Sequence, residues 1–176
     1  MPTGDGGTFD TRLHVRRWVG QFDDVVTQFV DSPVQVVWPL VEDVTRMPAW
    51  SPECRQVEWV PPHRRVRVGA VFRGYNRRGW IQWSTICRIV EHHVDSVDHR
   101  YRLTFVAGHW SGAATEWTYI VAQEDSGTRL TIAFRSVGTS RTVLFLDRLV
   151  GRPRGLRADV ALTLSRIAAA ARTPLS

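Results

Sequence analysis

The chain has 176 residues, of which 43% are hydrophobic and 23% charged, and its formal net charge is +6 at pH 7. This length suits one domain with a sizeable core, and the composition is that of an ordinary globular protein. No apolar run approaches the roughly 20 residues that a membrane span needs, and the polar start lacks the apolar segment of a secretion signal. We therefore expect one domain in the cytoplasm.

Charge and cysteine content point to no special chemistry. All 23 basic residues are Arg, a bias that a GC-rich genome produces without selection for nucleic-acid binding. Cys54 and Cys87 are expected to be reduced thiols that pack as small hydrophobic groups. No spacing of Cys and His resembles a zinc site, so the sequence predicts neither a metal nor a cofactor.

The first elements follow a short polar leader. Residues 1–23 are expected to form an N-terminal arm that is partly disordered. Val25 to Val30 is rich in strand-forming residues. Asp31-Ser32-Pro33 then predicts a helix start, with a capping side chain followed by Pro at the first helical position. This helix should reach about Val44 with a kink at Pro39, and a second short helix should span Arg46 to Trp50.

A hairpin is predicted between Gly69 and Cys87. Two runs of strand-forming residues flank Asn76-Arg77-Arg78-Gly79, which has the glycine of a tight turn. Inward and outward residues alternate along both arms, as in half-buried strands. The second arm should end at about Glu91, followed by a polar turn over His92 to Asp98.

The remaining segments predict further strands and one long helix. The strands are expected at Arg55–Val60, Arg100–Ala107, Ala114–Gln123 and Arg129–Val137. An apolar helical turn is expected over 142–150. Gly151-Arg152-Pro153-Arg154-Gly155 should interrupt it, because Pro and Gly disfavour a helix interior. A helix from Leu156 to Arg172 would then complete the chain.

This order predicts an α+β fold: a seven-stranded curved antiparallel sheet wrapped around a long C-terminal helix, with two short helices after the first strand. The helix must cross the concave face so that both apolar surfaces are buried. We assign this domain to residues 24–172 and a tail to residues 173–176.

Several motifs in this order resemble the START-like (SRPBCC, Bet v 1-like helix-grip) superfamily and its polyketide cyclase/dehydrase group. They are Asp31-Ser32-Pro33 through Val37-Trp38, the stretch Met47 to Glu53, the hairpin with Gly69, Phe72, Gly74, Asn76, Gly79, Trp83 and Cys87, then Gly127 to Thr131 and the last helix. The resemblance implies a cavity between sheet and helix for an apolar or aromatic small molecule. Its members include lipid carriers, hormone receptors and aromatase/cyclases, so it implies no single activity.

Residues on the expected inner faces are the candidate pocket. They are Trp50, Phe72, Asn76, Trp83, Thr85, Tyr101, Phe105, Trp117, Tyr119, Phe134, Val160 and Leu164. For any single aromatic residue the alternative is that it only fills the core. As a group they favour a pocket, since apolar walls with a few polar groups are typical of ligand sites.

No catalytic residue is predicted. The alternation places Glu58, Glu91 and Glu116 on outer faces, which leaves no inward general base. Cys87 has no expected neighbour that would lower its pKa. If the protein is instead an enzyme of the cyclase or dehydratase type, the candidates are Asn76, Tyr119 and the loop residue His109.

Two clusters of arginine leave a third interpretation open. They are Arg64, Arg65, Arg67, Arg73, Arg77 and Arg78, and Arg148, Arg152, Arg154 and Arg157. They would suit nucleic acid or an acidic partner, but no nucleic-acid-binding motif accompanies them and a solvated surface explains them as well. The leading hypothesis is binding of a lipid- or polyketide-like molecule, with nucleic acid not expected as a partner and the oligomeric state left open.

Overall fold

A computed structural model of the protein describes residues 24–108, 114–137 and 152–173. The expectations for the arm at 1–23, the helical turn at 142–150, the loop residue His109 and the end of the tail lie outside these residues.

Seven strands form one antiparallel sheet, which confirms the predicted fold class. They are β1 (Asp24–Val30), β2 (Cys54–Trp59), β3 (Val71–Arg78), β4 (Ile81–Asp95), β5 (Arg100–Gly108), β6 (Ala114–Glu124) and β7 (Gly127–Val137). Their order across the sheet is β1-β7-β6-β5-β4-β3-β2. The first strand therefore pairs with the last, and the other strands follow as hairpins in chain order.

The short helices lie between β1 and β2, as predicted. They are α2 (Val34–Glu42), the 3₁₀ turn η1 (Val44–Arg46) and α3 (Met47–Trp50). The predicted cap by Asp31 or Ser32 is wrong, as is the place of Pro33 inside the helix: Pro33 occupies the N-cap position, and no side chain caps the helix. The Ser32 hydroxyl instead donates to the carbonyl oxygen of Asp31 at 2.6 Å and also lies 3.1 Å from the carbonyl oxygen of Ala171, near the end of the chain's last helix.

The β3–β4 turn is tighter than predicted. Arg78 pairs with Ile81 across the hairpin, so the turn consists of Gly79 and Trp80 rather than residues 76–79. Gly79 has φ of +59°, the value that a type II′ turn requires at its first central position and that glycine adopts without strain. Asn76 consequently lies within β3, where it pairs with Trp83.

The second arm of this hairpin is longer than predicted. β4 continues to Asp95, so the expected polar turn over 92–98 is wrong for its first residues. The register shifts between Ile89 and Glu91. Because a bulge adds one residue, Val90 and Glu91 both avoid the inner face, and His92 turns inward opposite Leu103.

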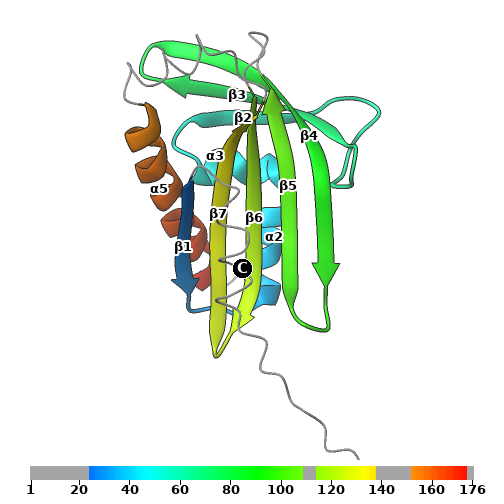
Figure 1. The fold of residues 1–176 in the computed structure, drawn as a ribbon, viewed down its shortest axis with the longest axis vertical. Helices are drawn as coiled ribbons and strands as arrows, with labels where there is room; N and C mark the ends of the chain where they lie inside the picture. Colours follow the sequence, from blue (N-terminus) through cyan, green and yellow to red (C-terminus); the bar gives the residue numbers. More distant parts are fainter. Residues whose placement is uncertain (1–23, 109–113, 138–151, 174–176) are drawn as a thin grey trace, which may run out of the picture.

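β4 joins two parts of the sheet that run in different directions. Its first half pairs with β3 and its second half with β5, and the two pairings overlap over Ile86 to Arg88. Figure 1 shows β2 and β3 running across the ends of the longer strands β5, β6 and β7. The β3–β4 hairpin therefore projects from the sheet as a wing, and the concave face extends beneath it.

The long helix α5 (Arg152–Arg172) begins earlier than predicted. The expected break at 151–155 is wrong from Arg152 onward, because Pro153 falls in the first turn, where its missing N–H disrupts no helical hydrogen bond. The helix packs against β1, β7, α2 and α3 (Figure 1). Within the described part of the chain, no helix has the length and apolar character to cross a membrane.

Candidate functional site

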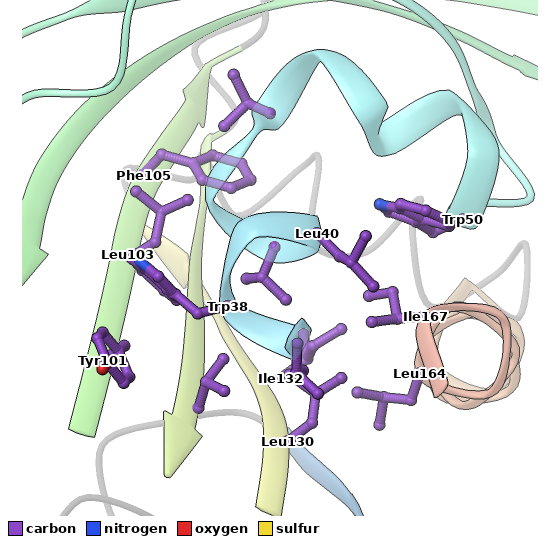
Figure 2. Packing of buried hydrophobic residues seen from close by; sticks show 14 of the residues in the cluster. Trp38, Leu40, Trp50, Tyr101, Leu103, Phe105, Leu130, Ile132, Leu164 and Ile167 are labelled. Carbon is purple, nitrogen blue, oxygen red and sulfur yellow. The ribbon is translucent and has the colours of Figure 1, made fainter. Parts of the chain in front are cut away.

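The concave face is filled where α2 and the C-terminal half of α5 lie on it. Leu103 of β5 and Leu130 and Ile132 of β7 are at most 1% exposed. Leu164 and Ile167 of α5 meet this cluster from the helix side (Figure 2). Side chains packed at protein density leave no room for a guest, so this end of the face is core.

A stack of aromatic rings closes the filled end. Trp38 of α2 lies over Tyr101, with ring centroids 5.2 Å apart and an interplanar angle of 25°. His92 stacks near the same indole at 6.0 Å, and its Nε2 lies 2.7 Å from Oε1 of Glu42. Tyr101, predicted to line the pocket, thus lies beneath Trp38 within the filled region.

Beneath the wing, the inward residues of the same face are only partly buried. The residues that point inward there and keep accessible surface are Asn76, Trp83, Thr85, Ala107, Trp117 and Tyr119. β5 and β6 are interior strands, paired on both sides. The surface that their inward side chains keep accessible therefore lies on the concave face and not at an edge of the sheet. The predicted pocket residues divide accordingly into a filled and an open end.

Aromatic rings form a continuous band between these two ends. Phe72 meets Phe105 edge to face, with centroids 5.3 Å apart, and Trp59 meets Phe72 in the same way at 5.9 Å. Phe105 in turn stacks on Tyr119 at 6.1 Å. These separations are those of favourable aromatic pairs, so the band is a rigid apolar wall across β2, β3, β5 and β6.

A second aromatic pair extends the wall toward β7. Trp117 and Phe134 are register partners, and their ring centroids lie 5.3 Å apart at 39°. Phe134 is only 6% exposed, whereas Trp117 is half-buried. Trp117 therefore keeps accessible surface on this face, and Phe134 packs beside it.

Small polar groups follow each other along the wing. The Asn76 amide donates to Thr85 Oγ1 at the long distance of 3.5 Å, and the same oxygen lies 3.6 Å from Cys87 Sγ. Gly74 lies next to these groups. A Cβ at this position would crowd Thr85 Oγ1 at 3.2 Å, and glycine avoids this contact. A hydrogen bond of this length is weak, so the Asn76 amide retains capacity for another partner.

Two thiols and a phenol on this face are held in their protonated forms. Burial raises the pKa of Cys54 to about 11 and that of Cys87 to about 12. Burial also raises the pKa of Tyr119 above its ordinary range, and the neighbouring Cys54 and Cys87 contribute in the same direction. At neutral pH these groups serve as hydrogen-bond donors or apolar surface, and none is a nucleophile or a base.

Trp50 supplies a further donor. Its side chain is buried, and its Nε1 has no hydrogen-bond partner among the described residues. Figure 2 shows the indole beside Leu40 and Ile167 with its nitrogen end turned toward the interior of the cluster. Buried N–H groups without a partner are rare in folded proteins, and this one lies within the packed cluster rather than at the open end of the face.

The described strands place no carboxylate on the inner face, and the inward His92 is paired with Glu42 beside Trp38 at the filled end. Among the inward residues of β2–β7 that the structure describes, none is Asp or Glu. As predicted, Glu58, Glu91 and Glu116 lie on the outer face: Glu58 accepts from Tyr75, Glu91 pairs with Arg102 and Glu116 pairs with Arg135. In the described ranges, no group of three or more His, Cys, Asp or Glu is placed to hold a metal ion.

Arg78 fastens the wing to the long helix. Its Nε lies 2.7 Å from Oε1 of Glu53, and its Nη2 pairs with Asp159 of α5. The guanidinium passes over Gly155, where a Cβ would come within 3.0 Å of Nη1. One member of the first arginine cluster is therefore neutralised, and the wing tip is held against α5 near the open end of the face.

The predicted residues on α5 lie to one side of this open end. Val160 is 3% exposed and Leu164 is fully buried, and their helix contacts β1 and β7 rather than the middle strands. Sequence reasoning omitted Trp59, although its alternation with Val57 marked it as inward. It also omitted the covering role of Trp38, for which no local signal exists.

The fold is shared with proteins of low sequence identity. A hypothetical protein of Helicobacter pylori (jhp0584) has a TM-score of 0.64 at 11% identity, covering 98% of this chain and 99% of that chain. A STAR-related lipid transfer protein fragment from Xanthomonas axonopodis gives 0.59 at 12%, covering 85% of each. Major latex-like protein 151 of Panax ginseng gives 0.54 at 16%, covering 85% and 97%. At these identities the likeness is one of fold.

None of the curated proteins compared with the chain matches its sequence. The family described as "Polyketide cyclase / dehydrase and lipid transport" matches residues 21–172, a span that contains every element from β1 to α5. The resemblance to the START-like superfamily is confirmed by this match and by the structural neighbours. The chain belongs to the polyketide cyclase/dehydrase and lipid transport family.

Proposed function

We propose that the protein binds one apolar or aromatic small molecule, lipid- or polyketide-like, between the open end of the sheet and α5. The observation that carries this proposal is that Tyr119 is enclosed by protein and still keeps accessible surface. Its pKa is raised by burial, yet the residue keeps accessible surface and belongs to the aromatic band. A group that is enclosed by protein and still accessible is expected at the wall of a ligand site.

The walls indicate the chemistry of the ligand. Aromatic rings supply much of the surface, and the Asn76 amide and the Tyr119 hydroxyl are neutral donors. No carboxylate among the described inward residues of β2–β7 would pair with a cation. The ligand that suits these groups is largely apolar and carries an uncharged oxygen acceptor, such as a carbonyl or hydroxyl group.

Two tyrosines allow a matched test. Displacement of the dye 1-anilinonaphthalene-8-sulfonate by oleic acid and by an anthraquinone would be measured for the wild type, Tyr119→Phe and Tyr101→Phe. We expect displacement by at least one probe, weakened by Tyr119→Phe and unchanged by Tyr101→Phe, whose ring lies under Trp38. No displacement by either probe, with empty native mass spectra of protein from its own host, would contradict the proposal.

The same donors bear on the enzymatic alternative. A protonated Tyr119 and the Asn76 amide would polarise a carbonyl of a bound polyketide chain, which is a contribution to cyclase-type chemistry. Among the described inward strand residues none is Asp or Glu, and His92 lies at the filled end, where it pairs with Glu42 and stacks near Trp38. Binding is thus the function that these residues support best, and a cytoplasmic location stays a prediction.

A further inference from the structure

The tip of the β3–β4 wing exposes two large apolar side chains next to each other. Trp80 is 88% exposed and Ile81 is 50% exposed. The turn itself requires only glycine at position 79, and a polar residue would satisfy the position of Trp80 equally well. Burial is therefore not the reason for this indole, and a contact outside the described chain is expected for it.

The surroundings of the tip are basic. From residue 59 to residue 90 the sequence contains no Asp or Glu, and it contains seven arginines. Arg77 lies on the tip, is exposed, and donates from Nε to the carbonyl oxygen of Gly79 at 2.8 Å. The guanidinium is thus held beside Trp80, so the exposed indole and a positive charge form one surface.

The turn at the opposite end of β4 provides a contrast. Val97 is 86% exposed there, but Asp95 and Asp98 flank it, and the Asp95 carboxylate accepts hydrogen bonds from the backbone N–H groups of Val97 and Asp98. Both hydrogen bonds lower the pKa of Asp95, and the one from the Asp98 N–H has the larger effect. Exposed apolar surface is therefore combined with positive charge at one end of the strand and with negative charge at the other.

The tip is also held beside the candidate binding site. Arg78, next to the turn, pairs with Glu53 and with Asp159 of α5. Asn76 and Trp83, two residues further along the same hairpin, lie on the open part of the concave face. A surface that receives Trp80 would thus come close to the open end of the site.

We propose that the wing tip docks on the surface of an anionic lipid bilayer. Trp80 and Ile81 enter the interface between headgroups and acyl chains, where indole rings are favoured, and Arg77 contacts the acidic headgroups. The tip is convex and apolar, which favours a bilayer. Nucleic acid is bound mainly through polar contacts to several phosphates, which this tip does not offer. The idea that docking delivers a ligand rests on the proposed function. The docking itself does not depend on it.

Labels at the two ends of β4 test this directly. Trp80→Cys and Val97→Cys, each in a Cys54→Ala/Cys87→Ala background, would carry an environment-sensitive fluorophore. Each would be mixed with vesicles of phosphatidylcholine alone or with phosphatidylglycerol added. We expect a blue shift for the label at position 80 with anionic vesicles only, and none for the label at position 97.

Sedimentation with the same vesicles measures the strength of docking in the unlabelled protein. Trp80→Ala should weaken binding on the order of tenfold, because the indole supplies most of the inserted apolar surface. Arg77→Gln should weaken it about fivefold, the contribution of one basic residue near an anionic membrane, and should reduce its salt dependence. Val97→Ala should leave it unchanged.

The remaining outcomes are decisive as well. Absence of wild-type sedimentation at low salt, retention on duplex DNA without vesicle binding, or a dimer that Trp80→Ala converts to monomer would each overturn the inference. Dye displacement by oleic acid in the absence of vesicles is measured separately and should survive Trp80→Ala. Docking without any ligand binding would contradict the proposed function alone, and ligand binding without docking would contradict this inference alone.

Discussion

Two buried thiols contribute to the response of the protein to alkaline pH. The ordinary pKa of each is 9.0, and burial raises that of Cys54 to about 11 and that of Cys87 to about 12. Above about pH 9 the unfolded chain ionises its thiols while the folded protein retains the protons. The unfolded state then binds fewer protons, so the free energy of unfolding falls as pH rises through this range.

Replacement of Cys87 should remove about half of the pH dependence that the two thiols cause. Between about pH 8 and about pH 10.5, the free energy of unfolding of the wild type should fall by about 2 kcal/mol more than that of Cys87→Ala. Urea unfolding at the two pH values measures both differences, and residues that titrate in both proteins cancel. An equal fall in the two proteins would show that the thiol is not protected from ionisation.

The unpaired indole N–H of Trp50 gives a second prediction at this scale. Trp50→Phe removes apolar contact but also a buried donor without a partner, whose burial costs about 1–3 kcal/mol. These effects offset each other, so stability should change by less than about 1 kcal/mol. Trp38→Phe is the control: its ring stacks on Tyr101 and His92, and its loss should be more destabilising in chemical unfolding. Equal losses of stability in Trp50→Phe and Trp38→Phe would contradict the interpretation that the Trp50 N–H is buried without a partner.

Among the elements, the pairing of β1 with β7 depends on a close approach at Gly127. A Cβ there would lie 2.6 Å from the carbonyl oxygen of Val30 and 2.5 Å from Cζ of Phe29. Because backbone cannot move aside as a side chain does, Gly127→Ala should destabilise the protein by about 1–3 kcal/mol. Gly108→Ala has 3.7 Å to its nearest neighbour and should change the free energy of unfolding far less.

The wing and α5 should separate when their clasp is removed. Arg78 is 44% exposed and Asp159 is 24% exposed, so the pair contributes at most about 1 kcal/mol to global stability. Arg78→Gln should nevertheless increase hydrogen exchange at the β3–β4 turn, because the overlap of pairings in β4 is short. Asp159→Asn should reproduce this, and Arg77→Gln should not. Unchanged exchange in Arg78→Gln would show that the turn is held otherwise.

How far the sequence predicted these elements depended on side-chain patterning. Alternation placed Leu103 and Phe105 correctly because a half-buried strand must alternate. It did not reveal the bulge near Glu91 or the continuation of β4 to Asp95, because backbone pairing with β5 rather than apolar side chains forms that part. The start of α5 was missed because Pro and Gly are tolerated in a first turn.

The candidate site was predictable in composition but not in extent. The inner-face residues followed from strand spacing. The position of Trp38 decides which of these residues are covered. That position is set by the packing of α2 across the sheet rather than by local sequence. Tyr101 and Tyr119 have similar sequence contexts, yet one lies in the filled end and the other at the open end.

For the whole molecule, ligand binding should appear as thermal stabilisation. A ligand at about 100 times its dissociation constant adds about 2.7 kcal/mol to the free energy of unfolding. In a protein of this size, this corresponds to a rise of roughly 5–10 °C in the melting temperature. Differential scanning calorimetry with the probe that displaces the dye best should show a concentration-dependent rise. A constant melting temperature would contradict binding to the folded state.

The two border strands of the sheet have a consequence for behaviour at high protein concentration. β1 has seven residues and lies against α5, and β2 has six residues and lies against α3. Unpaired strand borders are the usual template on which separate chains join into aggregates, and short, helix-covered borders resist this. The longest strand, β4, lies inside the sheet. Association into cross-chain sheets should therefore require prior detachment of α5 or α3, which links the shelf life of the protein to the anchoring of its helices.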